Sequence, residues 1–400
     1  MRKIILLVVI LSFAFMLNAQ LEQRGFVRTH VGALIEDGGY SVLQNTFDWR
    51  LDYGKGDVEL YVNPVFNYDG LNENLELNLR QAYFDIYFDN FDLRVGKQQI
   101  IWGKADGVFI TDVISPRDIS EFILPDFDEI RIGINAVKLD YYLGNSTLEA
   151  VWIPIFQPTI IPDANSIWFP EMPDIFTQSI VEDAKEPEKK LSESELAIKY
   201  SYLGSAIDFE LMAAYMWDDN PTMHIYPQQE SLIIKPEYHR LPLVGASFGK
   251  SIFGAVLRGE GAYYFDKKFM VEDFSVNGVK EKDYAHYLVG YDHNLFGVNV
   301  SFQFIQEYIL GYENDFKNDE FSNTATFLAS KTFLRETLQF DIFGYYGVNN
   351  NDALLRPKIS YDFIDGFNVL LGANIFIGDE GNFGQYNENE MLYMKLKYDF

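Results

Sequence analysis

Apolar and polar residues alternate along most of the 400-residue chain, so its dominant period is two. From Phe296 to Phe304 the even positions carry Phe or Val, while Gly, Asn, Ser and Gln occupy the odd positions. The segment 392–400 repeats the pattern, with Leu, Met, Leu, Tyr and Phe on one side. Because successive side chains of a β-strand point to opposite faces, these segments predict strands that are apolar on one face and polar on the other.

The connectors between these segments alternate in length. Tight turns such as YGKG (53–56) and LGNS (143–146) alternate with long loops such as 103–130 and 154–192. Short turns at one rim and long loops at the other are typical of outer-membrane barrels, whereas a soluble sandwich has no reason for that order. We therefore predict an all-β fold, a transmembrane antiparallel up-and-down β-barrel of about eighteen strands, with sixteen also compatible. Both termini are expected at the periplasmic rim and the long loops outside the cell.

The first residues resemble an export signal rather than part of the fold. Two basic residues precede an uncharged apolar run, Ile4 to Leu17, and Ala19 offers a cleavage point. This order of a basic, an apolar and a small-residue region predicts a secretory signal peptide over residues 1–19. The barrel then occupies residues 20–400, and its expected location is the bacterial outer membrane.

Composition excludes several classes of function. The chain carries 32 Lys and Arg against 59 Asp and Glu, a net charge of −27, whereas nucleic-acid binding requires basic patches. It contains no cysteine, which excludes disulfides, thiol nucleophiles and cysteine-ligated metals. Its five histidines show no metal-ligand spacing, and the G-x-S-x-G match at 245–249 lies between two strands rather than at a strand-to-helix elbow. We therefore expect neither an enzyme nor a cofactor.

Acidic residues concentrate in three of the predicted loops, 181–190, 312–321 and 378–390. We interpret these acidic residues as part of solvated loops. The alternative is that divalent cations bridge them to a lipopolysaccharide-like glycolipid. The chain ends on Phe400, and a terminal aromatic residue on the last strand resembles the signal that the barrel-assembly machinery recognises in outer-membrane proteins. The expected partners are therefore outer-membrane lipid, that machinery and small solutes, and the oligomeric state stays open.

Three stretches of the sequence stand out: LRVGKQQIIWGKADGVFITDVISPRDIS (93–120), LEAVWIPIFQP (148–158) and LRGEGAYYFD (257–266). They resemble an uncharacterised family of bacterial outer-membrane porin-like β-barrel proteins, which is distantly similar to alginate-export and other porins. The first carries the R-x-G-K-Q strand followed by W-G and a long loop that recurs in this family. The resemblance implies a porin-like barrel but names no solute.

The loop after this strand carries both charged and apolar side chains. Arg94 and Gln98 lie opposite Val95 in the alternation and are expected to face the lumen. A long loop with its own apolar residues needs a place to bury them, so we expect 103–130 to fold into the barrel and narrow the pore. The alternative is an ordered loop that only caps the rim, and 154–192 is expected to cover the mouth. The candidate pore residues are Arg94, Gln98, Trp102, Lys104, Asp106, Asp112, Arg117, Asp118, Asp126, Asp128, Glu129, Arg131, Arg258 and Glu260.

The predicted function is an outer-membrane porin or channel that allows passive diffusion of small solutes, with selectivity set by luminal charges and the infolded loop. Both signs of charge line the predicted interior, so net charge does not decide between anions and cations. Two alternatives stay open. One is an outer-membrane transporter for hydrophobic compounds, with an apolar pocket and a lateral opening, and the other is a surface adhesin or structural barrel without conductance.

Overall fold

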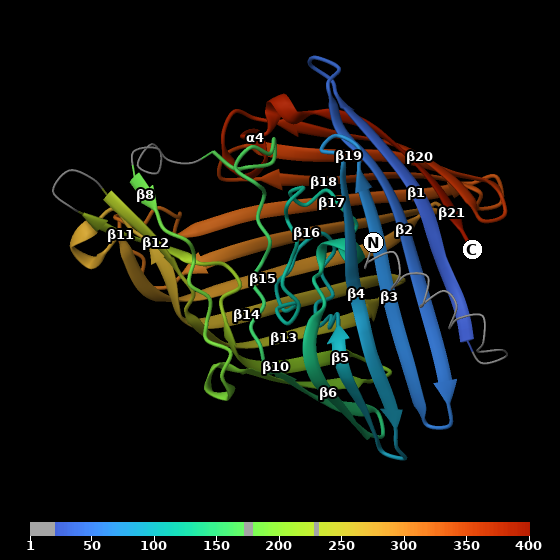
Figure 1. The fold of residues 1–400 in the computed structure, drawn as a ribbon, viewed down its shortest axis with the longest axis horizontal. Coiled ribbons are helices and arrows are strands. Elements are labelled where there is room, and N and C mark those ends of the chain that lie inside the picture. Colours follow the sequence, from blue (N-terminus) through green and yellow to red (C-terminus); the bar gives the residue numbers. More distant parts are fainter. Residues whose placement is uncertain (1–20, 172–178, 228–231) are drawn as a thin grey trace.

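The computed structural model describes residues 21–171, 179–227 and 232–400. The predicted signal peptide, residues 1–19, lies outside the described residues, as does part of the 154–192 loop. The described chain forms one 18-stranded antiparallel sheet that closes on itself as a barrel (Figure 1).

The barrel strands are β1 (Leu21–Leu34), β2 (Tyr40–Lys55), β3 (Val58–Asp69), β4 (Asn74–Tyr87), β5 (Phe91–Gln98), β6 (Ile134–Leu143), β7 (Ser146–Ile153), β9 (Glu195–Leu203), β10 (Asp208–Trp217), β13 (Arg240–Ile252), β14 (Ala255–Met270), β15 (Val279–Leu295), β16 (Val298–Ile309), β17 (Phe321–Phe333), β18 (Leu338–Gly347), β19 (Asp352–Ile364), β20 (Phe367–Ile377) and β21 (Met391–Asp399). Each pairs with the preceding and the following barrel strand, and β1 pairs with β21 to close the ring. The prediction of a closed antiparallel barrel is confirmed, with eighteen strands rather than sixteen.

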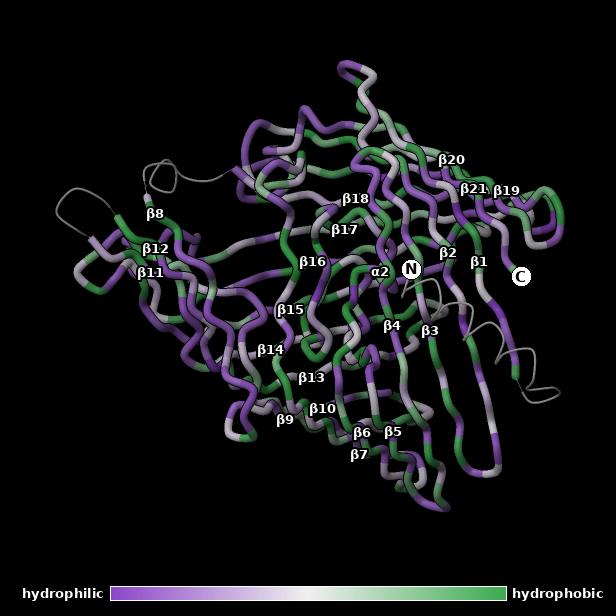
Figure 2. The backbone as a smooth tube through the Cα atoms, in the orientation of Figure 1, coloured by the Kyte–Doolittle hydropathy of each residue, from purple (hydrophilic) through white to green (hydrophobic). Residues whose placement is uncertain are grey.

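The two faces of the barrel strands follow the alternation in the sequence, and hydropathy changes from residue to residue along the wall (Figure 2). On β16, Phe302 points outward and is 52% exposed, whereas its neighbours Ser301 and Gln303 are buried inside. On β21, Leu396 points outward and is 42% exposed. Such a belt of exposed apolar side chains suits a hydrocarbon solvent, in which every backbone polar group must find its partner within the closed sheet.

The connectors sort as predicted. Short turns join β2 to β3, β4 to β5, β6 to β7, β9 to β10, β13 to β14, β15 to β16, β17 to β18 and β19 to β20, and the long loops lie at the opposite rim. The β15–β16 turn consists of Phe296 and Gly297, both at positive φ (54° and 77°), which is the left-handed geometry that tight hairpins require. Leu21 pairs with Tyr53 beside the β2–β3 turn, so both termini of the barrel lie at the short-turn rim.

A separate three-stranded sheet stands among the long loops, at the left of Figure 1. It consists of β11 (Thr222–Pro227) and β12 (Leu232–Glu237), which are antiparallel, and β8 (Ser179–Val181), which is parallel to β12. These strands are too short for their alternation to stand out in the sequence.

The helical elements of the described residues are all short. They are α2 (Phe127–Ile130), α4 (Gly381–Gly384) and the 3-10 turns η1 (Leu191–Glu193), η2 (Phe274–Val276) and η3 (Asn387–Asn389). No helix in the described ranges has the length and apolar character needed to cross a membrane.

Candidate pore and infolded loop

Residues 99–133 connect β5 to β6 and lie inside the ring of strands, as the teal segment of Figure 1 shows. Several of their apolar side chains are buried: Ile110 is 0% exposed and Trp102 is 2% exposed. They join one continuous cluster with luminal residues of the wall, among them Met212 on β10 and Ile305 on β16. Ile305 interrupts the alternation of its strand as an inward apolar residue, and this contact explains it. The hydrophobic effect thus holds the loop against one half of the lumen.

Glu260, on β14, fastens the loop to the wall. Its carboxylate accepts hydrogen bonds from the backbone N–H groups of Lys104 and Thr111, both at 2.8 Å, and from the Thr111 hydroxyl at 2.7 Å. Glu260 is buried. A buried carboxylate is costly unless such donors surround it, so these bonds fix where the loop passes.

Neighbouring strands hold the same stretch of loop. Arg258 on β14 donates to the Lys104 carbonyl at 2.7 Å and forms an ion pair with Asp106. Gln303 on β16 accepts from the Asp106 N–H at 3.1 Å and donates to the Asp106 carbonyl at 2.7 Å. Tyr345 on β18 donates to the Gly107 carbonyl at 2.7 Å. The first half of the loop is therefore bound across several strands of the wall.

The second half of the loop contacts other strands of the wall, β1 and β19. Arg28 on β1 makes a bidentate ion pair with Glu129, at 2.8 and 3.1 Å. Arg356 on β19 donates to the Ile123 carbonyl at 3.1 Å. Within the loop, Arg131 donates to Asp112 at 2.7 Å and so ties the end of the loop to its middle. The loop is thus held at both ends and spans the lumen.

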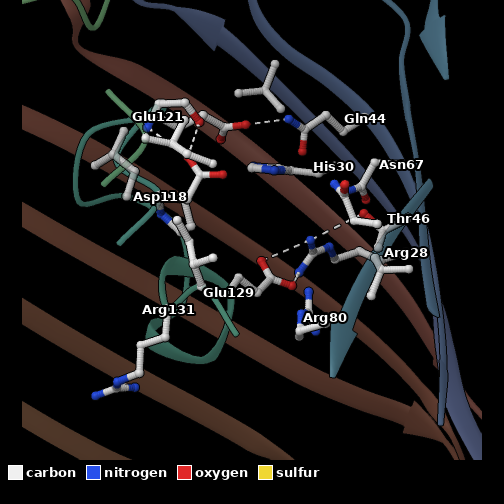
Figure 3. Close-up of a pocket in the computed structure, with 18 of the residues that line it drawn as sticks. Arg28, His30, Gln44, Thr46, Asn67, Arg80, Asp118, Glu121, Glu129 and Arg131 are labelled. Atoms are coloured by element: carbon white, nitrogen blue, oxygen red, sulfur yellow. Dashed lines mark hydrogen bonds and ion pairs between the residues drawn. The ribbon is translucent and has the colours of Figure 1, made fainter. Parts of the chain in front are cut away.

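An open cavity of about 330 Å³ remains between the second half of the loop and the wall formed by β1 to β5 and β21 (Figure 3). The wall side supplies cations, and the loop side supplies the anions. The charged lining residues are Arg28, Arg80, Lys97 and Lys395 from the wall, and Asp118, Glu121, Glu129 and Arg131 from the loop. Figure 3 shows Glu121 and Glu129 directed toward Gln44 and Arg28 of the wall. Charges separated in this way create an electric field across the cavity.

Burial changes the acidity of two carboxyl groups of the loop. Burial raises the pKa of Glu121, although the hydrogen bond from Gln44 opposes the change. Burial also raises the pKa of Asp112, against the stabilising charge of Arg131. In each group the partner favours the ionised form, which burial disfavours.

The wall beside this cavity is incomplete at the rim that carries the long loops. The strand β4 pairs with β5 only from Ala82 to Tyr87, so residues 74–81 bond in the sheet to β3 alone among the described strands. The cavity reaches this edge, where Leu79 is one of its lining residues and is exposed. The short strand β5 and the descent of the chain into the lumen after Gln98 cause the gap.

The predicted pore residues divide between the cavity and the attachment of the loop. Asp118, Glu129 and Arg131 line the cavity. Trp102, Lys104, Asp106, Asp112, Arg258 and Glu260 take part in the hydrogen bonds that hold the loop. The rest lie elsewhere in the lumen: Arg94 pairs with Asp85, Gln98 donates to the Ala136 carbonyl, Arg117 lies over the Phe109 ring, Asp126 pairs with Lys395, and Asp128 offers its carbonyl to Gln99.

Sequence reasoning missed several wall residues of the cavity, above all Arg28, His30 and Arg80. The alternation of β1 carried a signal for two of them, because Val27 faces outward and Arg28 and His30 therefore share the luminal face. What the alternation could not reveal is that this side of the lumen stays open.

The sequence matches, over residues 41–398, the family described as "Protein of unknown function (DUF1302)". A comparison with curated proteins finds no match.

Solved structures of the Occ outer-membrane porins share the fold. Pseudomonas aeruginosa OccK5 (OpdH) aligns with a TM-score of 0.56 at 10% identity, over 95% of this chain and 98% of its own. P. aeruginosa OccK2 (OpdF) in complex with glucuronate gives 0.56 at 11% identity, over 95% and 97%. Acinetobacter baumannii OccAB2 gives 0.57 at 10%, over 95% and 98%. At these identities the likeness concerns the fold.

Proposed function

Because the chain belongs to the DUF1302 family and folds as a porin-like barrel, we propose that it is an outer-membrane channel through which small polar solutes diffuse passively. The passage runs through the cavity between the infolded loop and the wall of β1 to β5 and β21. The loop narrows this passage, because it occupies the other half of the lumen with packed apolar side chains.

The separation of charge across the cavity carries this proposal. Arg80, Lys97 and Lys395 stand on the wall, and Asp118 and Glu121 stand on the loop, while Arg28 and Glu129 join wall and loop as an ion pair. A solute between them crosses a field perpendicular to its path, which favours small molecules with charged or strongly dipolar groups over apolar ones.

Ion selectivity in planar lipid bilayers tests the role of these charges. Glu121→Gln should shift the reversal potential toward anions, and Lys395→Gln should shift it toward cations. A unit charge about 8 Å from an ion in water contributes about 0.5 kcal/mol, so each change in permeability ratio should be about two- to threefold. Asp341→Asn is the matched control, because Asp341 is a buried luminal carboxylate on β18 that contacts Gln339 and Lys358 and does not line the cavity. Shifts of the same sign, or none, would contradict the assignment.

Liposome swelling with sugars of one size and different charge identifies the solute class. Glucuronate, the ligand named for the OccK2 structure, is a suitable anion, with glucose and glucosamine as the neutral and cationic counterparts. Unequal rates among the three support the charged passage. A barrel that conducts no ions and passes none of them would instead be an adhesin or structural barrel.

The open edge of β4 favours a second candidate, a transporter for hydrophobic compounds. Leu79 at the mouth of the cavity and the stretch 74–81, which does not pair with β5, would give an apolar compound a lateral way between the lumen and the lipid. This function predicts that a bulky Leu79→Trp variant slows uptake of an apolar probe and leaves ion conductance unchanged.

A further inference from the structure

A cluster of metal-binding side chains stands on the small sheet among the long loops, far from the cavity. It consists of His224 on β11, Glu237 at the end of β12, and His239 just before β13. One ligand atom of each lies within 4.8 Å of those of the other two. The infolded loop contributes no residue to it.

The register of the hairpin brings these residues together. His224 pairs with Lys235, and Thr222 pairs with Glu237, so His224 and Glu237 are diagonal neighbours across the two strands. Glu237 and His239 are two residues apart in extended chain and therefore share a face. The Nε2 atoms of His224 and His239 are 2.8 Å apart, and Nε2 of His224 is 4.0 Å from the carboxylate of Glu237.

The scaffold beneath the cluster is firmly held. Ile225 and Ile234, the neighbours of the ligating strand positions, are completely buried. The Ile225 N–H donates to the Asn277 carbonyl at 2.7 Å, which ties β11 to the loop after β14. The Asp218 N–H donates to the His239 carbonyl at 2.8 Å. Ligands on elements fixed in this way need little reorganisation to bind.

We propose that His224, Glu237 and His239 bind a divalent late transition metal ion, with Zn²⁺ as the preferred ion. Two imidazoles and one carboxylate form a ligand set that zinc accepts, with a water molecule in the fourth position. Tetrahedral Zn²⁺ with Zn–N bonds of about 2.0–2.1 Å places two ligating nitrogens about 3.3 Å apart. The two rings therefore need to separate by only about 0.5 Å, a side-chain rotation.

The surroundings leave room for the fourth ligand. Both histidines line an open cavity of about 450 Å³ together with Lys268 and Glu281. Lys268, Lys280 and Lys282 also line this cavity. Lys268 pairs with Glu281, and the other two pair with Glu313, which offsets part of their repulsion on a metal ion. Burial lowers the pKa of both imidazoles, which favours the neutral form that binds metals.

Metal titration of the whole protein, folded in detergent micelles, tests the site. We expect one Zn²⁺ per chain by calorimetry, and a Co²⁺ absorption spectrum typical of a tetrahedral site. His224→Ala and His239→Ala should each weaken binding at least about 100-fold, and Glu237→Gln about tenfold. His293→Ala is the matched control, since His293 lies at the opposite rim beside the Gly254 carbonyl, and it should bind as the wild type does.

Two outcomes would overturn the proposal. One is the absence of stoichiometric Zn²⁺ binding by the wild-type protein, which would mean that the two histidines are joined only by their hydrogen bond. The other is unchanged binding in the His224→Ala/His239→Ala double variant. Migration of unheated and heated samples on a denaturing gel shows whether each variant is folded. If a histidine variant does not fold, Glu237→Gln tests the site in its place. Conductance does not enter this test, so it stands apart from the channel assignment.

Discussion

At the scale of single residues, Glu260 decides the position of the infolded loop. Its carboxylate is buried in the wall and accepts hydrogen bonds from Lys104 and Thr111 of the loop. Lys104 and Thr111 lie 156 and 149 positions before Glu260 in the chain. The contact therefore does not hold the barrel together locally; it fixes the loop to the wall.

Glu260→Ala should release the loop without unfolding the barrel. The N–H groups of Lys104 and Thr111 lose their acceptor, and each buried donor left unpaired costs about 1–3 kcal/mol. We expect faster cleavage by added protease between residues 99 and 133 and a larger, noisier single-channel conductance. Asp341→Asn should behave as the wild type in both measurements. An unchanged cleavage rate in Glu260→Ala would show that apolar packing alone holds the loop.

At the scale of elements, the last strand closes the barrel. The Phe400 N–H and C=O exchange hydrogen bonds of 3.0 Å with Gly25, next to the paired part of β1 and β21. The Phe400 ring stacks on Phe47 of β2, with ring centroids 5.9 Å apart. The terminal residue thus contributes to the seam, besides its proposed role as a signal for the barrel-assembly machinery.

Phe400→Ala separates these two roles. The variant keeps the backbone bonds to Gly25 and loses a half-exposed ring, so refolding into detergent should lose only about 1 kcal/mol. If the machinery recognises the ring, the amount of folded barrel in cells should fall severalfold, as measured by heat-modifiable gel migration of outer membranes. Phe363→Ala, an equally exposed aromatic residue on β19, is the control. Equal amounts of both variants in cells would refute the signal.

At the scale of the whole molecule, the barrel is inverted relative to a soluble protein. Its belt of apolar side chains faces outward, and buried polar residues such as Gln303 and Asp341 face the lumen. The core inside is built by the loop rather than by the strands alone. Lipid is the solvent that this arrangement suits.

Depth in the bilayer should therefore set the cost of a charge on the outer face. Phe302→Arg places a cation in the middle of β16 and should destabilise the barrel in lipid by about 2–4 kcal/mol. Phe296→Arg places it at the turn, where Phe296 is 99% exposed, and should cost about 0–1 kcal/mol. Urea unfolding in lipid vesicles measures both. Equal costs would mean that this face does not contact hydrocarbon.

The alternation of side chains and the parity of the connectors sufficed to predict the strands, their faces and the closed barrel. These features depend on local sequence and on the requirement that a sheet in hydrocarbon has no open edge. The hairpin of β11 and β12 escaped prediction, because each of its strands has only 6 residues. The outward position of Phe302 and the inward position of Gln303 were both readable from the sequence.

Only the tertiary structure decided which luminal residues meet. A period of two tells that Glu260 and Arg28 point inward, but it gives neither their position around the ring nor their height in the wall. Those depend on strand register and on the path of the loop, which link residues more than a hundred positions apart, such as Arg28 and Glu129. The same holds for His224 and His239. Their positions in the sequence do not show a metal-ligand spacing, and they become neighbours because the hairpin of β11 and β12 folds one strand onto the next.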